Sequence, residues 1–469
     1  MARLTQRLLG DAPVAAHAAA ALMVAALVTL LQVLRLDPVV PLADAHGYGS
    51  IALDLHRYHT FTDGSELSPW PQPEPPPGMF VAPLYPSLVA GVLAMDLDSA
   101  DRLACMLEHR ARAVEAGCDL DLGLLVSVQA ALATISAFLV FVAGSLVCGS
   151  LACAWLAMLL ALATGEYALY AVQILTENLM FPLFTGFAIA AVLAWRRPTV
   201  VRWLAAGLLV GLAALVRPSF AYLFYASVVF AFVGLVVRGR GRVGRTALMT
   251  SMLALGYGIV VAPWVTRNVM LLGVADITAG YGGHELALRL SYNAMTWQEW
   301  LVAFVYWLPG FGDSLAATLF DPDLYERLAF DHLDGYYRIG QTFYRKTLAA
   351  AGRPEAHVAY LVQTFMLAEP IKHVMVTFAL LWRGLWVAKE WGLVAFVCFV
   401  PMAVVAVRRR WSEAIVFVLP PWFMAGFHAF VSVSVVRYNL ILIPCFAIAM
   451  AWAMLLLARA VRFLLSKVS

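Results

Sequence analysis

The chain has 469 residues, of which 62% are hydrophobic and only 13% are charged. A soluble globular domain has about twice that charged fraction. The net charge of +3 is small, and arginines occur in short groups between long apolar segments. The sequence therefore lacks the extended basic surface of a nucleic-acid-binding protein and predicts an all-α polytopic membrane protein with no nucleic-acid partner.

The apolar segments predict ten transmembrane helices, because about 20 apolar residues are needed to cross the roughly 30 Å hydrocarbon core. The first segment has no small-residue cleavage site at its end, so we predict an uncleaved first span rather than a signal peptide. The ten segments lie at about 14–36, 123–147, 150–168, 178–195, 203–218, 219–237, 246–266, 390–407, 414–432 and 438–458.

The groups of basic residues set the predicted topology, because arginine and lysine are retained on the cytoplasmic side of a membrane. With the N-terminus inside and ten spans, every group falls inside: Arg3 and Arg7; Arg196, Arg197 and Arg202; Arg238, Arg240, Arg242 and Arg245; Arg408 to Arg410; and Arg459, Arg462 and Lys467. Counting 79–95 as a further span would place every later group outside. Pro83 and Pro86 also restrict a helix there to about Leu84–Met95, roughly 18 Å long. We therefore predict a surface-lying or re-entrant helix and leave the ambiguous segment 371–388 out of the count.

This topology divides the chain into three regions. Residues 1–266 form an N-terminal transmembrane module that includes a first outer loop at 37–121. Residues 267–389 form a second large outer loop with amphipathic helices, and residues 390–469 form the C-terminal transmembrane helices. A proline-rich run from Pro69 to Pro77 in the first loop predicts an extended linker.

The stretch from Leu42 to Tyr58 in the first outer loop predicts an amphipathic helix. Tyr48, Ile51, Ala52 and Leu55 follow the i, i+3, i+4, i+7 spacing of one helical face. The stretch is too polar to span a bilayer, so we predict a helix on the membrane surface. Asp44 lies at its N-terminal end and is the strongest candidate for a reactive carboxylate.

Asp44, Glu177, Arg217 and Arg437 all fall on the same predicted side of the membrane. Ionisable residues at the ends of transmembrane helices cost free energy to place in the membrane and are often functional. Two arginines suit an anionic lipid phosphate, and a carboxylate suits proton removal from an attacking hydroxyl. Two alternatives remain open: the arginines could be interfacial anchors, and Glu177 could be a loop carboxylate or a helix cap.

No metal-binding or nucleotide-binding motif is present, and we predict neither a metal nor another cofactor. His46, His284 and His332 lack metal-ligand spacing and are interpreted as ordinary loop residues. Cys105 and Cys118 flank a charged helix-like stretch of the first loop. They could pair in an oxidising compartment or remain two thiols.

Several short motifs, in their order and spacing, resemble those of bacterial GT-C-type glycosyltransferases, which are related to protein O-mannosyltransferases and lipid A aminoarabinose transferases. The resemblance runs from about residue 14 to 458. The motifs are D-x-x-x-Y (Asp44, Tyr48), APLYPSL (Ala82 to Leu88, with Tyr85), T-E (Thr176–Glu177), G-L-x-x-G-L-A-x-L-x-R-P (Gly207 to Pro218), APWVTRN (Ala262 to Asn268) and R-Y-N (Arg437 to Asn439).

The resemblance implies a GT-C-like fold and assigns roles to these residues. Asp44 would be catalytic, and Glu177 would help to shape the acceptor site. Basic residues would hold the lipid phosphate: Arg217, Arg437 and, as a third cation, Arg267. The tyrosines of the motifs would contact substrate: Tyr48, Tyr85 and Tyr438. The chain departs from the usual acidic pair, because Ala45 follows Asp44, and it lacks a large soluble C-terminal domain.

The sequence therefore predicts a multi-pass glycosyltransferase of the plasma (inner) membrane whose active site faces the periplasm or exterior. It would move a sugar from a polyprenyl-phosphate donor to a lipid, polysaccharide or protein acceptor, with Asp44 as general base. One alternative is a polysaccharide ligase or polymerase acting on diphospholipids. Another is a transporter or lipid flippase, although the sequence lacks the two related halves with interrupted helices typical of transporters.

Overall fold

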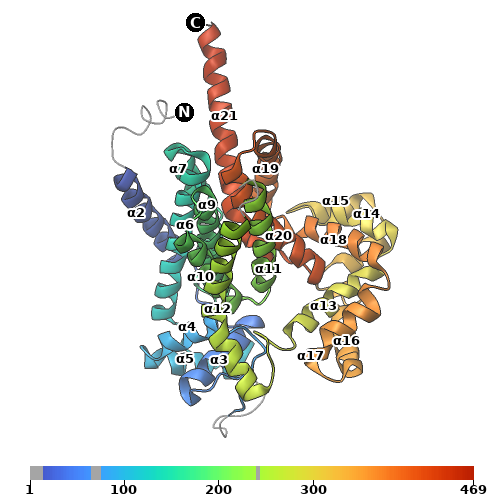
Figure 1. The fold of residues 1–469 in the computed structure, drawn as a ribbon. Coiled ribbons are helices and arrows are strands. Elements are labelled where there is room, and N and C mark those ends of the chain that lie inside the picture. The colour runs from blue at the N-terminus through green and yellow to red at the C-terminus, as the bar shows by residue number, and fades with distance from the viewer. Residues whose placement is uncertain (1–13, 65–74, 239–242, 469) are drawn as a thin grey trace. The chain divides into compact units, whose positions relative to one another are not determined.

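The computed structural model describes residues 14–64, 75–238 and 243–468. Within these ranges every regular element is a helix (Figure 1). The chain forms two compact units, described separately below. Unit 1 comprises Met1–Ile277, Val405–Phe417 and Ala447–Ser469, and unit 2 comprises Thr278–Val404 and Val418–Phe446. Most of the predicted proline-rich linker and the basic residues Arg3, Arg7, Arg240 and Arg242 lie outside the described residues.

Eight helices of the described chain are long and apolar enough to cross a membrane, so the protein is an all-α polytopic membrane protein. These eight coincide with eight of the ten predicted spans. The other two predicted spans, 150–168 and 203–218, form shorter apolar helices, α7 (Leu151–Leu162) and α10 (Val200–Val216). At 1.5 Å per residue α10 is about 25 Å long, whereas α7 is only about 18 Å long. Gly165, at φ 72°, separates α7 from the short helix α8 (Glu166–Ala171).

The two ambiguous apolar segments do not form straight spans. The segment 79–95 contains only α4 (Leu84–Leu93), which begins directly after Pro83, as predicted, and is about 15 Å long. The segment 371–388 lies mostly in α18 (Pro370–Gly384), which meets the helical stretch Pro354–Met366 at a 106° bend. Pro370 occupies the first turn of α18, where its missing N–H is tolerated, so it starts a new helix after the bend.

Unit 1 contains the N-terminal helices. The elements not yet given are α2 (Val14–Val33), α3 (Asp44–Tyr58), α5 (Leu97–His109), η1 (Arg110–Arg112), α6 (Gly123–Cys148), α9 (Glu177–Arg196), α11 (Phe220–Arg238) and α12 (Val243–Leu272). Glycines allow α10 and α12 to pack closely. A Cβ at Gly207 would lie 2.1 Å from the Leu253 carbonyl oxygen, and a Cβ at Gly256 would lie 2.3 Å from the Leu204 carbonyl oxygen. Such small-residue contacts let membrane helices approach to backbone distance.

Helix α3 starts and ends where the sequence predicts, and its predicted apolar face contains Ile51 and Ala52, which are buried. However, α3 is more enclosed than a helix with one buried stripe, because α4 and α5 both pack against it (Figure 1). His46 Nε2 lies 3.0 Å from the Leu107 carbonyl oxygen of α5. Even Asp54 is buried, and its carboxylate accepts a 2.6 Å hydrogen bond from the Thr62 hydroxyl.

A disulfide joins Cys105 of α5 to Cys118, which resolves the two alternatives left open by the sequence in favour of pairing. The bond ties α5 to the segment that follows η1. The disulfide stabilises α5, and α5 packs on α3 and contacts His46. It therefore also supports α3, the helix that carries Asp44.

Unit 2 contains the second predicted loop and parts of the C-terminal helices. Its elements are α13 (Tyr281–Ser291), η2 (Tyr292–Ala294), α14 (Trp297–Tyr306), α15 (Gly312–Leu319), η3 (Pro322–Leu324), η4 (Glu326–Leu328), α16 (Tyr336–Ala351), α17 (Pro354–Leu361), the π-helical η5 (Val362–Met366), α18, η6 (Val436–Leu442) and segments of α19 (Glu390–Arg408), α20 (Ser412–Val431) and α21 (Ile443–Val468). Its core includes the fully buried Arg289, which donates to Ala429 and His373 carbonyl oxygens at 2.8 Å and to Asn293 Oδ1 at 2.9 Å.

Candidate functional site

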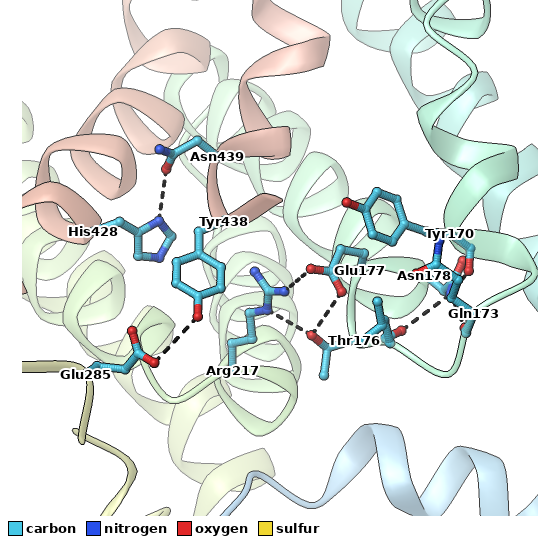
Figure 2. Close-up of polar contacts among 11 residues, drawn as sticks. Tyr170, Gln173, Thr176, Glu177, Asn178, Arg217, Glu285, His428, Tyr438 and Asn439 are labelled. Carbon is cyan, nitrogen blue, oxygen red and sulfur yellow. Dashed lines mark hydrogen bonds and ion pairs between the residues drawn. The ribbon is translucent and has the colours of Figure 1, made fainter. Parts of the chain in front are cut away.

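The centre of the candidate site in unit 1 is an ion pair between Glu177 and Arg217 (Figure 2). Glu177 is the first residue of α9 and is fully buried, and the positive end of the helix dipole favours its carboxylate. Arg217 immediately follows α10, which ends there because a residue before proline is forced into extended backbone. Arg217 Nε also donates to the Thr176 hydroxyl at 2.9 Å. The pair therefore fixes the start of α9 against the end of α10.

Asn178 holds the turn that leads into α9. Its amide donates to the Tyr170 carbonyl oxygen at 2.5 Å and to Gln129 Oε1 at 3.1 Å (Figure 2 shows Asn178 beside Tyr170 and Gln173). Gln129 lies in the second turn of the apolar helix α6 and also donates to the Ala171 carbonyl oxygen at 2.9 Å. These buried hydrogen bonds fix the position of Glu177, one residue before Asn178.

Tyr85 connects this turn to the first loop. Its hydroxyl donates to Gln129 Oε1 at 2.7 Å, and its ring meets the Tyr48 ring edge-to-face at 5.7 Å. Burial raises the pKa of Tyr85 well above its usual range, and the negative charge of Glu177 raises it further. The phenol therefore stays protonated and acts as a donor near Glu177.

Asp44 lies one helical turn before Tyr48, on the same face of α3. It is exposed and is the first helical residue, whereas Ala43 occupies the N-cap position with φ 51°. A positive φ at a residue with a Cβ is uncommon and often marks a functional segment. The structure thus brings Tyr48, Tyr85, Glu177 and Arg217 together in unit 1 and places Asp44 one turn from Tyr48.

Arg267 occupies a different part of unit 1. Its guanidinium donates to the carbonyl oxygens of Gly78 at 2.7 Å and Phe61 at 2.9 Å. It also lies 4.8 Å from the centre of the Trp264 ring. Arg267 therefore links Phe61 and Gly78 of the first loop to α12. Its predicted role as a phosphate ligand remains a prediction.

Arg437 and Tyr438 belong to unit 2, where both lie in η6. The Arg437 guanidinium lies 5.6 Å from the centre of the Tyr438 ring. The Tyr438 hydroxyl donates to Glu285 Oε1 at 3.5 Å, and Figure 2 shows Tyr438 between Glu285 and His428. Their predicted substrate contacts also remain predictions.

The sequence did not identify Gln129, Asn178 or Glu285 as site residues. Gln129 carried a usable signal, because burying an amide within an apolar span is costly unless the amide has hydrogen-bond partners. Asn178 directly follows the recognised T-E motif. Glu285 and its neighbour His284 offered no spacing signal, because their partners Tyr438 and Tyr344 are distant in the sequence.

One group of described residues has metal-ligand geometry: Cys105, His109 and Cys118, whose ligand atoms lie within 4.8 Å of one another. The two sulfurs are joined in the disulfide described above, so neither acts as a thiolate ligand in this state.

No known protein-family model matches the chain, and no curated protein matches it either. Among solved structures, the chain is similar to the archaeal oligosaccharyltransferase AglB from Archaeoglobus fulgidus, determined in complex with an inhibitory peptide and a dolichol-phosphate. The sequences are 13% identical, with a TM-score of 0.45. The match covers 95% of this chain and 51% of that one, so the chain spans about half the length of the solved protein.

Proposed function

We propose that the protein is a membrane glycosyltransferase that moves a sugar from a polyprenyl-phosphate donor to a hydroxyl-bearing acceptor. The observation that carries this proposal is a hydrogen-bonded connection within unit 1 from the first-loop residue Tyr85, through Gln129, to Asn178. Asn178 directly follows Glu177 of the buried Glu177–Arg217 pair, and Tyr85 also meets Tyr48. An exposed carboxylate, Asp44, lies one turn from Tyr48. A transporter offers no reason to fix a first-loop helix against such a pair.

In the proposed reaction Asp44 is the general base. The acceptor oxygen attacks the anomeric carbon of the sugar while its proton passes to the Asp44 carboxylate. The bond between the anomeric carbon and the phosphate oxygen breaks, and polyprenyl phosphate leaves with the electron pair. Attack from the side opposite the leaving group inverts the anomeric configuration. Since phosphate is a good leaving group, positioning and stabilisation of its charge supply much of the rate.

The other residues position these groups. Glu177 and Arg217 hold α9 and α10 together beside Tyr85, and Tyr85 contacts the helix that carries Asp44. We propose that Arg217 and Arg437 contribute positive charge toward the lipid phosphate, and that Tyr48, Tyr85 and Tyr438 border the substrate. The acceptor class, whether lipid, polysaccharide or protein, is left to experiment.

The direct test offers the purified protein a panel of labelled polyprenyl-phospho-sugars together with lipid, polysaccharide and peptide acceptors. We expect acceptor-dependent release of polyprenyl phosphate from at least one donor. Release from a diphospholipid donor alone would favour the ligase or polymerase alternative. No release from any donor, together with movement of a lipid across a vesicle bilayer, would instead indicate a flippase.

We propose that the first loop faces the exterior or periplasm. Met95, which is 79% exposed after α4, provides a suitable site for a single introduced cysteine. We expect Met95→Cys to react with a membrane-impermeant thiol reagent in intact cells, and Arg409→Cys to react only after permeabilisation. The parent protein without the introduced cysteine sets the background. Protection of Met95→Cys in intact cells would contradict the ten-span topology.

A further inference from the structure

Unit 2 contains a polar cluster formed by His284, Glu285, Tyr344, His357 and Tyr438, of which the proposed mechanism uses only Tyr438. Both protein contacts of the Glu285 carboxylate are made by Oε1: the Tyr438 hydroxyl at 3.5 Å and His284 Nδ1 at 3.6 Å. The His284 ring lies 4.9 Å from the Tyr344 ring, and the Tyr344 ring lies 5.5 Å from that of His357. Three helices and η6 therefore contribute to one cluster.

The second carboxylate oxygen of this cluster is buried without a donor. The Glu285 side chain is only 13% exposed, and among the described residues no group donates to Oε2. Leaving a buried acceptor unsatisfied costs about 1–3 kcal/mol, and more for a charged group. Such a group calls for a specific explanation, and a ligand that brings its own donor is one.

His357 supplies a second buried polar atom without a partner. Its Nε2 lies 2.9 Å from the Thr347 hydroxyl, which also lies 2.9 Å from the Phe343 carbonyl oxygen. Burial, and the nearby His284, lower the pKa of His357, which keeps the ring neutral. Nδ1 is buried and has no partner in the described part of the chain.

A buried carboxylate oxygen beside tyrosine rings indicates the chemistry of a ligand. Glu285 Oε2 requires an O–H or N–H from the ligand, and a sugar hydroxyl supplies one. His357 Nδ1 is packed against Gly283 and is not counted as a ligand contact. A phosphate is disfavoured, because it brings only acceptors and negative charge next to a carboxylate. Aromatic rings offer apolar surface beside the polar contacts, as in most small-molecule sites.

We propose that the cluster around Glu285 is a sugar-binding subsite in which a sugar hydroxyl donates to Glu285 Oε2. This inference rests on the proposed function, which supplies two sources of such a hydroxyl: the transferred sugar of the donor and a carbohydrate acceptor. Tyr438 and His284 lie 3.5 and 3.6 Å from the other oxygen of the carboxylate, so Oε2 is the oxygen that a ligand donor would satisfy.

The test compares two lipids that differ only in the sugar. Binding of a labelled polyprenyl-phospho-sugar and of polyprenyl phosphate to the full-length protein is measured for wild type, Glu285→Ala and Glu285→Gln. We expect Glu285→Ala to weaken binding of the sugar-bearing lipid by about 10- to 100-fold, the loss typical of a hydrogen bond to a charged group, with polyprenyl phosphate unchanged. Glu285→Gln preserves the shape and should give a smaller loss. Glu355→Ala, which removes an exposed carboxylate of α17 in the same unit, is the matched control.

The outcomes distinguish the two sources of the sugar hydroxyl, the donor and a carbohydrate acceptor. A loss confined to the sugar-bearing lipid assigns the subsite to the donor, whereas a raised acceptor KM with normal donor binding assigns it to the acceptor. Equal losses for both lipids, or no change in any of these measurements, would overturn the proposal. A wild-type protein that binds the sugar-bearing lipid more tightly than polyprenyl phosphate but never transfers the sugar would contradict the proposed function, while the Glu285 comparison would still be valid.

Discussion

Replacing Asp44 with Asn should reduce turnover by about 10²-fold or more, the usual scale for loss of a general base. Asn keeps the size and most of the hydrogen-bonding capacity of the side chain but has almost no basicity. Donor binding should stay near the wild-type value, because the proposed role of Asp44 is in proton transfer. The measurement is single-turnover release of polyprenyl phosphate at saturating donor.

The structure allows the loss of a general base to be distinguished from a loss of stability of α3. Ala43, not Asp44, occupies the N-cap of α3, so Asp44 does not cap the helix but places its charge near the positive end of the helix. Loss of that charge costs about 0.3–1 kcal/mol of stability, which thermal unfolding in detergent would detect as a small shift. Asp37→Asn, at an exposed position before α3, is the control and should leave turnover unchanged. Near-wild-type turnover of Asp44→Asn would exclude Asp44 as the base.

Replacing Arg217 with Ala should destabilise the protein by about 3–5 kcal/mol, because it leaves the fully buried Glu177 carboxylate without its ion-pair partner. If Arg217 also contacts the lipid phosphate, donor binding should weaken by about 2–5 kcal/mol in the protein that remains folded. Thermal unfolding in detergent measures the first effect, and binding of labelled donor measures the second.

A double substitution distinguishes the two roles of Arg217. In Glu177→Gln with Arg217→Met, neither charge remains, so much of the lost stability should return. Donor binding should nevertheless stay weak if the guanidinium contacts phosphate. Recovery of both stability and donor binding would show that Arg217 serves only to pair with Glu177.

Arg437→Ala tests the second predicted phosphate contact, and unchanged donor affinity in both single arginine variants would favour their interpretation as interfacial anchors.

Local chemistry made several elements predictable. Pro83 stops a helix from extending backward, so the start of α4 at Leu84 followed from proline geometry alone. The periodicity of α3 identified its buried face. In contrast, the break after α7 was missed because Thr164, Gly165 and Glu166 interrupt the apolar segment only briefly, and hydropathy does not register a left-handed backbone.

The candidate site was predictable only as a set of residues. The motif spacing selected Glu177 and Arg217, but not that they pair with each other, because packing of α9 against α10 decides their distance. Asn178 meets Gln129 across 49 residues, and Glu285 meets Tyr438 across 153. No sequence periodicity records contacts between helices that are this far apart along the chain.

The disulfide between Cys105 and Cys118 makes the maturation of the protein depend on the compartment in which its first loop folds. A cross-link closing a loop of this length, 13 residues apart in sequence, stabilises a fold by about 3 kcal/mol. Protein that accumulates in a reducing cytosol, or is purified with excess thiol, would lack that contribution in the helix that supports α3. Preparations for assay should therefore be made without reductant, and their free-thiol content should correlate inversely with specific activity.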